Sequence, residues 1–594
     1  MWLRHVGALL LGAVAIAAAL APPVAHGDTV IEGNIDGYVT WQEASSPYLL
    51  KGGVTITPGS TLVIKKGVKV KVAAGGVLRV YGHLGADGTQ AEPIRFTSDG
   101  SLAYDHWSGI EVGPPASETE LASASLAYCI IERAGRDTGY AGGAVRCKSL
   151  KGPAPWVKLY KTTIQKSATN GLYLERVGLG AVHVEECTIQ DCGRRPVQLV
   201  ACGGPTFKGK NLFRDNGQRW IGVSGLGMDG IWDRAPVPYS WDTTESGPSV
   251  AVTGGRLMVW DAIVLVPTGG GIVAQRGTLQ ADLTLFTSWE HYLGNPPAAG
   301  RWAGIRAYDG AKCQLVNCEV YDTGQSGQPA VHCSGSTTLL RMSRCEIGYG
   351  AVGVVFNQCQ PKSDIRGTWF HDLTDYGLRI WGEGASPVVT NCVFEGIRNT
   401  AIEVGPDAAG AYLGNVKNLN PSDDGGNAFL DRDSWAVANN SPRLVRAQNN
   451  WWGFTTADEI SSFRISDRND SPSRGVVRFQ PFLTEEPAQG PGAPTQPIGL
   501  TAMPTGAGGA TICFSLASPA AVDVAVLNAA GRPVRQLCAS RSLDAGAQAV
   551  TWDGRSDQGL RAPDGMYVVR VTAYGESGVK ASGLAGLRLS RSRR

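Results

Sequence analysis

The chain has 594 residues, and its 54 Lys and Arg nearly balance its 52 Asp and Glu. With no basic block before the last few residues, nucleic acid is not an expected partner. Hydrophobic residues make up 43% of the chain and glycine supplies 78 positions, which is typical of a turn-rich β protein with a buried core and not of a disordered chain.

Residues 1–27 are predicted to be a secretory signal sequence. Arg4 and His5 precede an almost wholly apolar run from Gly7 to Leu20, and small residues at Ala25 and Gly27 suit a cleavage site. No later apolar run approaches the roughly 20 residues that a membrane helix needs, so no membrane span is expected after signal removal. These features predict a secreted or cell-surface protein.

Residues 28–50, which contain Trp41 and Tyr48, are predicted to form an N-terminal cap. From Val54 onward, apolar and polar residues alternate, as expected for the first strands of a longer domain. A cap is needed because the open end of a stack of strands exposes unpaired backbone groups.

Residues 51–484 are built from short strands that recur at a regular spacing. The segment that begins at Ile365 recurs from Val389, 24 residues later, and a fixed period of this size indicates a stacked-repeat architecture. Because no unit has the apolar stripe of a helix, the strands are expected to pair with their copies about 4.8 Å away in the next repeat. With Cys392 as the reference position, the equivalent residues are Thr368, Cys345, Cys318, Asn211, Cys187, Thr162 and Cys129. The cysteines of this column are predicted to be unpaired and buried.

These repeats, the opening run from Val54 to Gly67 and the late motif Asn449-Asn-Trp-Trp-Gly453 resemble the right-handed parallel β-helix proteins of the pectate-lyase-like superfamily. The resemblance implies an all-β fold with a right-handed parallel β-helix over residues 51–484. It does not specify an activity, because the superfamily includes lyases, hydrolases, epimerases and adhesins.

A Pro/Gly-rich linker is expected at 485–498, followed by a second domain at 499–594. The segments Leu527–Val534 and Trp552–Gly559 resemble the immunoglobulin-like domain of the flagellar hook-capping protein. This resemblance implies a small β-sandwich that serves export or surface attachment through a secretion or anchoring machinery. Cys513 and Cys538 are the favoured disulfide pair, because an exported domain meets an oxidising environment.

Acidic residues recur four positions after the reference position, at Asp191, Asp215, Asp322 and Asp372. Each stands two residues before a Gly or Thr in a turn sequence, so a turn-capping role is favoured. Asp191 and Asp215 are one repeat apart, and the alternative that they hold a calcium ion stays open. No other cofactor is expected.

The resemblance to calcium-dependent lyases implies Arg379, His371 and Asp372 as catalytic candidates, with Arg379 or His371 handling the proton. Aromatic and polar residues on outward strand positions suit sugar rings, which have apolar faces and hydroxyl rims. The predicted ligand-binding residues of this kind are Tyr321, Trp369, Tyr173, His332 and Glu403.

Two functions remain open at this level. In the first, the lateral face of the solenoid binds a polysaccharide or cell-envelope glycan without cleaving it. In the second, the same face cleaves acidic polysaccharide by β-elimination. The first is favoured, because every catalytic candidate also has a turn or surface explanation. No two carboxylates have a spacing that would predict a glycosidase pair.

Overall fold

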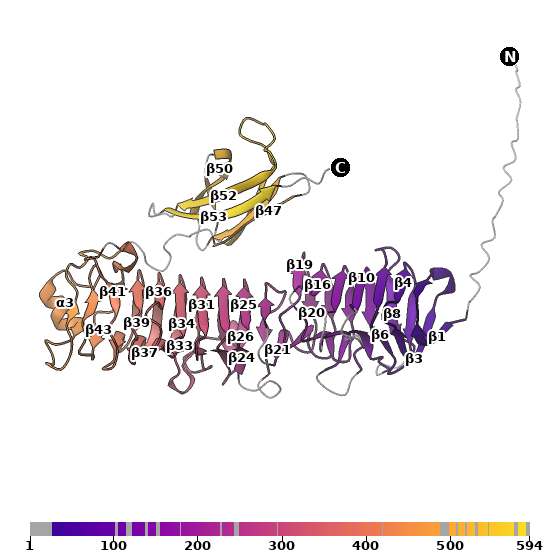
Figure 1. Cartoon of the computed structure of the whole chain (residues 1–594), viewed down its shortest axis with the longest axis horizontal. Helices are drawn as coiled ribbons and strands as arrows, with labels where there is room; N and C mark the ends of the chain where they lie inside the picture. Colours follow the sequence, from indigo (N-terminus) through magenta and orange to yellow (C-terminus); the bar gives the residue numbers. More distant parts are fainter. Residues whose placement is uncertain are drawn as a thin grey trace, which may run out of the picture.

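The computed structural model describes residues 27–589 (Figure 1). Segments outside the description are 101–104, 114–120, 137–140, 150–154, 179, 226–228, 243–248, 294, 419, 488–497, 506–508, 517–519, 529–532, 545 and 575–579. The predicted signal sequence therefore lies outside the described residues, except for Gly27, and so does most of the predicted linker.

The N-terminal domain is a parallel β-helix in which each coil contributes one strand to each of three faces. The first and second faces join into one 29-stranded sheet, because β1 (Thr29–Ile35), β3 (Tyr48–Ile56) and some later strands bend across both. The other first-face strands are β5 (Lys69–Val72), β8 (Ile94–Ser98), β11 (Cys129–Glu132), β14 (Thr163–Gln165), β17 (Thr188–Gln190), β20 (Leu212–Arg214), β23 (Tyr239–Ser240), β26 (Ile263–Val266), β29 (Leu285–Ser288), β32 (Glu319–Tyr321), β35 (Glu346–Asn357), β37 (Trp369–Trp381), β39 (Val393–Ile397) and β42 (Ala428–Phe429).

The second face runs beside the first, and β35 and β37 continue into it. Its other strands are β6 (Val77–Val80), β9 (Gly109–Val112), β12 (Gly143–Lys148), β15 (Asn170–Glu175), β18 (Val197–Val200), β21 (Ile221–Ser224), β24 (Ser249–Thr253), β27 (Gly271–Gln275), β30 (Ile305–Tyr308), β33 (Val331–Ser334), β40 (Thr400–Val404), β43 (Trp435–Asn439) and β45 (Ile465–Ser466).

The third face is interrupted near the middle of the solenoid and consists of a seven-stranded and a ten-stranded sheet. The first contains β2 (Tyr38–Trp41), β4 (Thr61–Lys65), β7 (His83–Asp87), β10 (Ser123–Ala127), β13 (Trp156–Tyr160), β16 (Val182–Glu185) and β19 (Thr206–Lys208). The second contains β22 (Gly230–Trp232), β25 (Arg256–Trp260), β28 (Thr278–Asp282), β31 (Lys312–Val316), β34 (Leu339–Ser343), β36 (Asp364–Arg366), β38 (Val388–Thr390), β41 (Tyr412–Gly414), β44 (Val445–Ala447) and β46 (Val477–Arg478).

Helices are short in the described part of the chain. The α-helices are α2 (Trp289–Tyr292) and α3 (Ala457–Phe463), and three single 3₁₀ turns are η1 (Glu43–Ser45), η2 (Gln325–Gly327) and η3 (Pro421–Asp423). No helix among the described residues is long and apolar enough to cross a membrane.

Single residues with left-handed backbone conformation close the corners of the coils. Asp191, Asp215, Asp322 and Asp372 have φ angles of 54°, 54°, 63° and 49°. Asp and Asn adopt this conformation at less cost than most residues, because their short polar side chains bond locally. The four aspartates thus have the backbone conformation of a bend, as expected for their corner positions, although Asp372 lies within the continuous strand β37.

The core consists of inward columns that stack from coil to coil. The predicted cysteine column is buried, and all thirteen cysteines are free. Near the C-terminal end the rings of Phe370, Phe394 and Phe429 stack at centroid distances of 5.0 and 5.2 Å, and Trp452 continues the stack at 5.0 Å. Trp452 of the late Trp-Trp motif therefore packs against the last coils.

Two irregular segments of the sequence belong to the coil structure. Residues 28–50 supply β1 and β2, which pair with β3 and β4 and begin the solenoid. The Pro- and Gly-rich region 223–249 contains β22 and β23, with Trp232 and Tyr239 buried and stacked 5.4 Å apart. Its aromatic residues are core residues of a coil, which the Pro and Gly around them concealed.

The C-terminal domain is an antiparallel β-sandwich with its own apolar core. One sheet contains β47 (Ile498–Pro504), β48 (Ala510–Leu516) and β51 (Gly546–Trp552), and the other contains β50 (Pro533–Leu543), β49 (Ala520–Asn528), β52 (Gly565–Tyr574) and β53 (Lys580–Leu589). The disulfide expected between Cys513 and Cys538 is absent, because these cysteines are free thiols on β48 and β50 of opposite sheets.

Candidate functional site

The outer column comprises the first-face residues three positions after the reference position, and it differs between the two halves of the solenoid. In the N-terminal half, its side chains bind one another. Gln165 Nε2 donates to Glu132 Oε2 at 2.8 Å, Gln190 Nε2 donates to Gln165 Oε1 at 3.2 Å, and Arg214 Nε donates to Gln190 Oε1 at 2.9 Å. Arg95 also donates to Glu132 at 2.9 Å. These mutual bonds make a polar ladder with a structural role.

In the C-terminal half the outer column is interrupted by a glycine. Tyr321, Gly348 and His371 occupy successive coils in register. A Cβ atom at Gly348 would lie 2.3 Å from His371 Cε1, so only glycine leaves room for the imidazole ring. His371 extends across this gap, and its Nε2 atom lies 3.1 Å from Oε1 of Glu346 on the neighbouring strand.

His371 lies between two carboxylates. Its Nδ1 atom is 2.9 Å from Asp372 Oδ2, opposite the contact with Glu346. Burial alone would lower the pKa of His371, but hydrogen bonds to Glu346 and Asp372 outweigh it and raise this pKa. Burial alone would raise the pKa of Glu346, but the bonds with His371 and Tyr321 lower it. The geometry therefore favours an imidazolium between carboxylates.

A second glutamate, Glu319, lies beside Glu346. The two residues are in-register neighbours on β32 and β35. The hydroxyl of Tyr321 donates to Glu346 Oε1 at 2.6 Å. Glu319 itself is exposed, but partial desolvation by its neighbours and the negative charge of Glu346 raise its pKa. Neighbouring carboxyl groups thus have pKa values displaced in opposite directions.

Aromatic rings surround these ionisable groups. The ring of Trp369 lies 4.1 Å from that of His371, and the ring of Tyr349 lies 4.9 Å from it at nearly a right angle. Tyr321 is 5.6 Å from Tyr349. Solvent still reaches the site, because the side chains of Asp372 and Glu346 are 59% and 32% exposed. We call the following seven residues the aromatic-acidic cluster: Glu319, Tyr321, Glu346, Tyr349, Trp369, His371 and Asp372.

Asp322 organises the loop beside this cluster. Its fully buried carboxylate accepts hydrogen bonds from the hydroxyls of Thr287 and Ser288, both at 2.8 Å, and from the backbone N–H of Ala298 at 3.0 Å. His291 Nδ1 lies 3.1 Å from the same carboxylate, and the ring of His291 is 5.5 Å from that of Tyr321. Asp322 therefore holds the loop so that His291 completes one side of the cluster.

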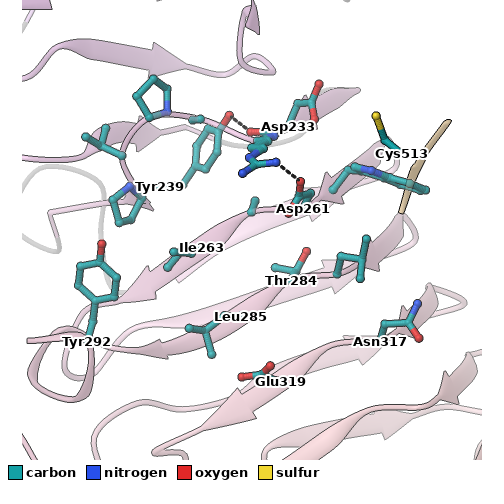
Figure 2. A pocket seen from close by; sticks show the side chains of 18 of the residues that line it. Asp233, Tyr239, Asp261, Ile263, Thr284, Leu285, Tyr292, Asn317, Glu319 and Cys513 are labelled. Carbon is teal, nitrogen blue, oxygen red and sulfur yellow. Dashed lines mark hydrogen bonds and ion pairs between the residues drawn. The ribbon is translucent and has the colours of Figure 1, made fainter. Parts of the chain in front are cut away.

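A pocket of about 1000 Å³ adjoins the cluster (Figure 2). Ile263, Leu285 and Glu319 lie on successive in-register strands and line it. The same column continues to Glu346 and Trp369. Glu319 thus lies where the pocket meets the cluster. The pocket is also lined by Asp233, Tyr239, Asp261, Tyr292, Asn317 and, from the C-terminal domain, Cys513.

Arg379 and Glu403 form a separate pair on the second face. Arg379 Nε donates to Glu403 Oε2 at 2.7 Å, and the guanidinium lies 4.5 and 4.4 Å from the ring centroids of Tyr376 and Trp381. His332 lies on the same face, in register with Arg306 and two coils before Arg379. Burial lowers the pKa of His332.

Tyr173 lies far from the cluster along the solenoid and is buried, in register with Arg146 and Gln198. Lys148 lies 5.5 Å from its ring. Of the predicted residues, the structure thus brings together Tyr321, Trp369, His371 and Asp372. It separates them from Arg379, Glu403, His332 and Tyr173.

Asp191 and Asp215 occupy equivalent corners of successive coils and are exposed. Asp215 lies 4.0 Å from Arg214. Within the described ranges, no group of three or more His, Cys, Asp or Glu residues is arranged to hold a metal ion.

Four residues of the site were not predicted from the sequence: Glu319, Glu346, Tyr349 and His291. The two glutamates could have been found, because both stand one position after the reference cysteines Cys318 and Cys345. His291 belongs to a loop outside the repeat, so no periodic signal marks it.

Two families match parts of the chain. Residues 298–440 match the family described as right handed beta helix region, and residues 501–577 match the FlgD Ig-like domain. No curated protein matches the sequence. The protein is thus a right-handed β-helix with a C-terminal immunoglobulin-like domain, as the sequence resemblances implied. The whole aromatic-acidic cluster lies within the β-helix match, whose description names no activity.

Proposed function

We propose that the protein binds a polysaccharide or cell-envelope glycan on the first face of the solenoid, at the aromatic-acidic cluster. The supporting observation is the gathering of Tyr321, Tyr349, Trp369 and His371 around partly exposed carboxylates. Aromatic rings pack on the apolar faces of sugars, and carboxylates accept hydrogen bonds from their hydroxyls. The neighbouring pocket extends this surface along the solenoid axis, as a chain-like ligand requires.

The β-elimination alternative has less support from the geometry. Arg379, one of the two residues expected to handle the proton, forms an ion pair with Glu403 and stacks against Tyr376 and Trp381. His371, the other, is held between the carboxylates of Glu346 and Asp372. The cluster itself contains three carboxyl groups, which repel an acidic glycan unless cations intervene. A neutral or amino-bearing glycan fits this charge better.

Retention of the protein on immobilised glycans tests the binding proposal. Xylan, mixed-linkage glucan, chitosan, homogalacturonan and peptidoglycan are suitable, each with and without calcium. We expect at least one neutral or amino-bearing polymer to retain the protein, and Tyr349→Ala and Trp369→Ala to weaken retention about tenfold or more. Tyr38→Ala, an exposed aromatic at the N-terminal end, is the matched control. Retention unchanged by both cluster variants contradicts the proposal.

Export is the second part of the proposal. The signal-like N-terminus supports secretion, and the match to the FlgD Ig-like domain supports attachment of the C-terminal domain to an export or surface structure. A chain truncated after residue 484 should still be secreted by a general route but should lose its surface association. Unchanged surface association of the truncated chain would count against this role.

A further inference from the structure

We infer that the proposed glycan site also hydrolyses its ligand, with Glu319 and Glu346 as the two catalytic carboxyl groups. This activity rests on the proposed glycan binding and goes beyond it. Three features of the site carry the inference: the separation of the two carboxyls, their different environments and the space beside Glu319.

The two carboxyl groups have the separation that a retaining glycoside hydrolase requires. Glu319 and Glu346 are in-register neighbours on parallel strands, so their backbones are about 4.8 Å apart. The hydroxyl of Tyr321 donates to Glu346 Oε1 at 2.6 Å. Side chains that leave in-register positions of neighbouring strands on one face stay about one strand spacing apart, so the two carboxyl groups are roughly 5 Å apart. Retaining enzymes place their carboxyls about 5–5.5 Å apart, and inverting enzymes place them farther apart.

The environments of the two glutamates assign their roles. Partial desolvation and the charge of Glu346 favour a protonated Glu319, which suits a general acid. Contacts with His371 and Tyr321 favour an ionised Glu346, which suits a nucleophile. Two carboxyl groups whose surroundings displace their pKa values in opposite directions are the usual basis for such an assignment.

The surroundings leave room for a sugar and hold Glu346 in place. Glu319 lines the adjoining pocket, so a glycosidic oxygen can approach its carboxyl from that side. Glu346 Oε1 receives contacts from both Tyr321 and His371, and His371 is fixed in turn by Asp372. Tyr321 and His371 are therefore positioning residues for Glu346.

The reaction proceeds in two balanced steps. The Glu346 carboxylate attacks the anomeric carbon while Glu319 gives its proton to the glycosidic oxygen, so that the C–O bond breaks, an ester to Glu346 forms and the first sugar leaves. Glu319 then takes a proton from water, whose oxygen attacks the same carbon and releases Glu346. The second sugar leaves with its original anomeric configuration, and Glu319 is protonated again.

The test measures cleavage and binding separately, with the full chain and the polymer panel described above. We expect new reducing ends from at least one polymer that retains the protein. Proton NMR should show that the products keep the anomeric configuration of the substrate. Glu319→Gln and Glu346→Gln should each slow cleavage about 10²–10⁴-fold, a far larger effect than either change has on retention by the polymer. Glu186→Gln, an exposed glutamate several coils away, is the matched control. Azide should restore turnover of Glu346→Ala by acting as the nucleophile, which a merely structural role of Glu346 would not allow.

Other outcomes overturn the inference. If a polymer retains the protein but releases no reducing ends, the binding proposal stands and the hydrolytic inference is rejected. Full activity of Glu319→Gln has the same consequence. Unsaturated products would assign elimination instead. If no polymer retains the protein, the binding proposal fails, and this result alone does not decide the hydrolytic inference. Cleavage of dinitrophenyl glycosides, which requires little of the site beyond the two carboxyl groups, then decides the hydrolytic inference. If the protein does not cleave them, the inference is rejected.

Discussion

The N-terminal and C-terminal coils present the same outer column to solvent but fill it in different ways. In the N-terminal coils, Glu132, Gln165 and Gln190 bond to one another, and few polar atoms are left for a ligand. In the C-terminal coils, Gly348 breaks the column and His371 crosses the gap to Glu346. Where the side chains of the outer column bond to one another, they stabilise the solenoid. Where the column is interrupted, ionisable groups are left directed at solvent. Variants can test this distinction.

The largest effect is expected from Asp322→Ala. This change leaves the backbone N–H groups of Ser288 and Ala298 without their shared acceptor, at a cost of about 1–3 kcal/mol for each buried unpaired group. Hydrogen exchange of these two amides should rise, and glycan retention should fall because His291 is displaced. Lys166→Ala, at the equivalent corner of an N-terminal coil, should change neither. Unchanged protection at Ala298 contradicts the organising role of Asp322.

Gly348→Ala should impair the site more than it destabilises the fold. The added Cβ atom would overlap the imidazole of His371, and such overpacking costs about 1–3 kcal/mol. Because His371 must then leave Glu346, glycan retention and any cleavage should drop more than thermal stability does. Gly348→Ala combined with His371→Ala should recover the lost stability without recovering retention. Full glycan retention by the single variant would show that the contact between His371 and Glu346 is not needed.

The pH dependence of stability should be smaller but diagnostic. The pKa of His371 is raised in the folded chain above its ordinary value of 6.5, so the charged imidazole stabilises the fold fully below that value. This contribution is lost as the pH rises through the folded-state pKa. In His371→Gln this charge-dependent stabilisation is missing at every pH. The unfolding midpoints of the variant and of the unchanged protein should therefore differ at low pH and converge above neutral pH. A difference that grows with rising pH has the wrong sign for this site.

The smallest effect is expected in the N-terminal ladder. Gln165→Leu removes hydrogen bonds to Glu132 and Gln190 on a partly exposed surface, where each bond contributes about 1 kcal/mol or less. Thermal unfolding should shift only slightly and glycan retention should stay unchanged. A clear loss of retention would show that ligand also binds the N-terminal coils, and the contrast between the two halves would fail.

The solenoid could be predicted because its core repeats. Each coil places a small residue and then a large apolar residue in fixed positions, so the column of Cys345 and Cys392 appears in the sequence itself. The bend at the acidic corners was also predictable, since Asp adopts the left-handed conformation more readily than most residues. The sequence therefore determined the architecture through interactions that recur in every coil.

The site was only half predictable, because it depends on contacts that do not recur. Trp369, His371 and Tyr321 could be placed on one face by the repeat. The contact between His371 and Glu346 depends on the missing side chain at Gly348, and the position of His291 depends on a loop held by Asp322. The pKa values of Glu319 and Glu346 also shift only when adjacent coils are stacked, because each shift depends on residues of a neighbouring coil.

The corner that follows the first face explains how one coil can be altered without its neighbours. In β37 the chain passes this corner at Asp372 without leaving the strand, whereas residues 289–304 separate β29 from β30 at the corresponding place. Both arrangements keep the same strand pairing on either side. Evolution can therefore lengthen the chain here, one coil at a time, and an engineer could graft recognition loops at the same corners to give the solenoid new specificities.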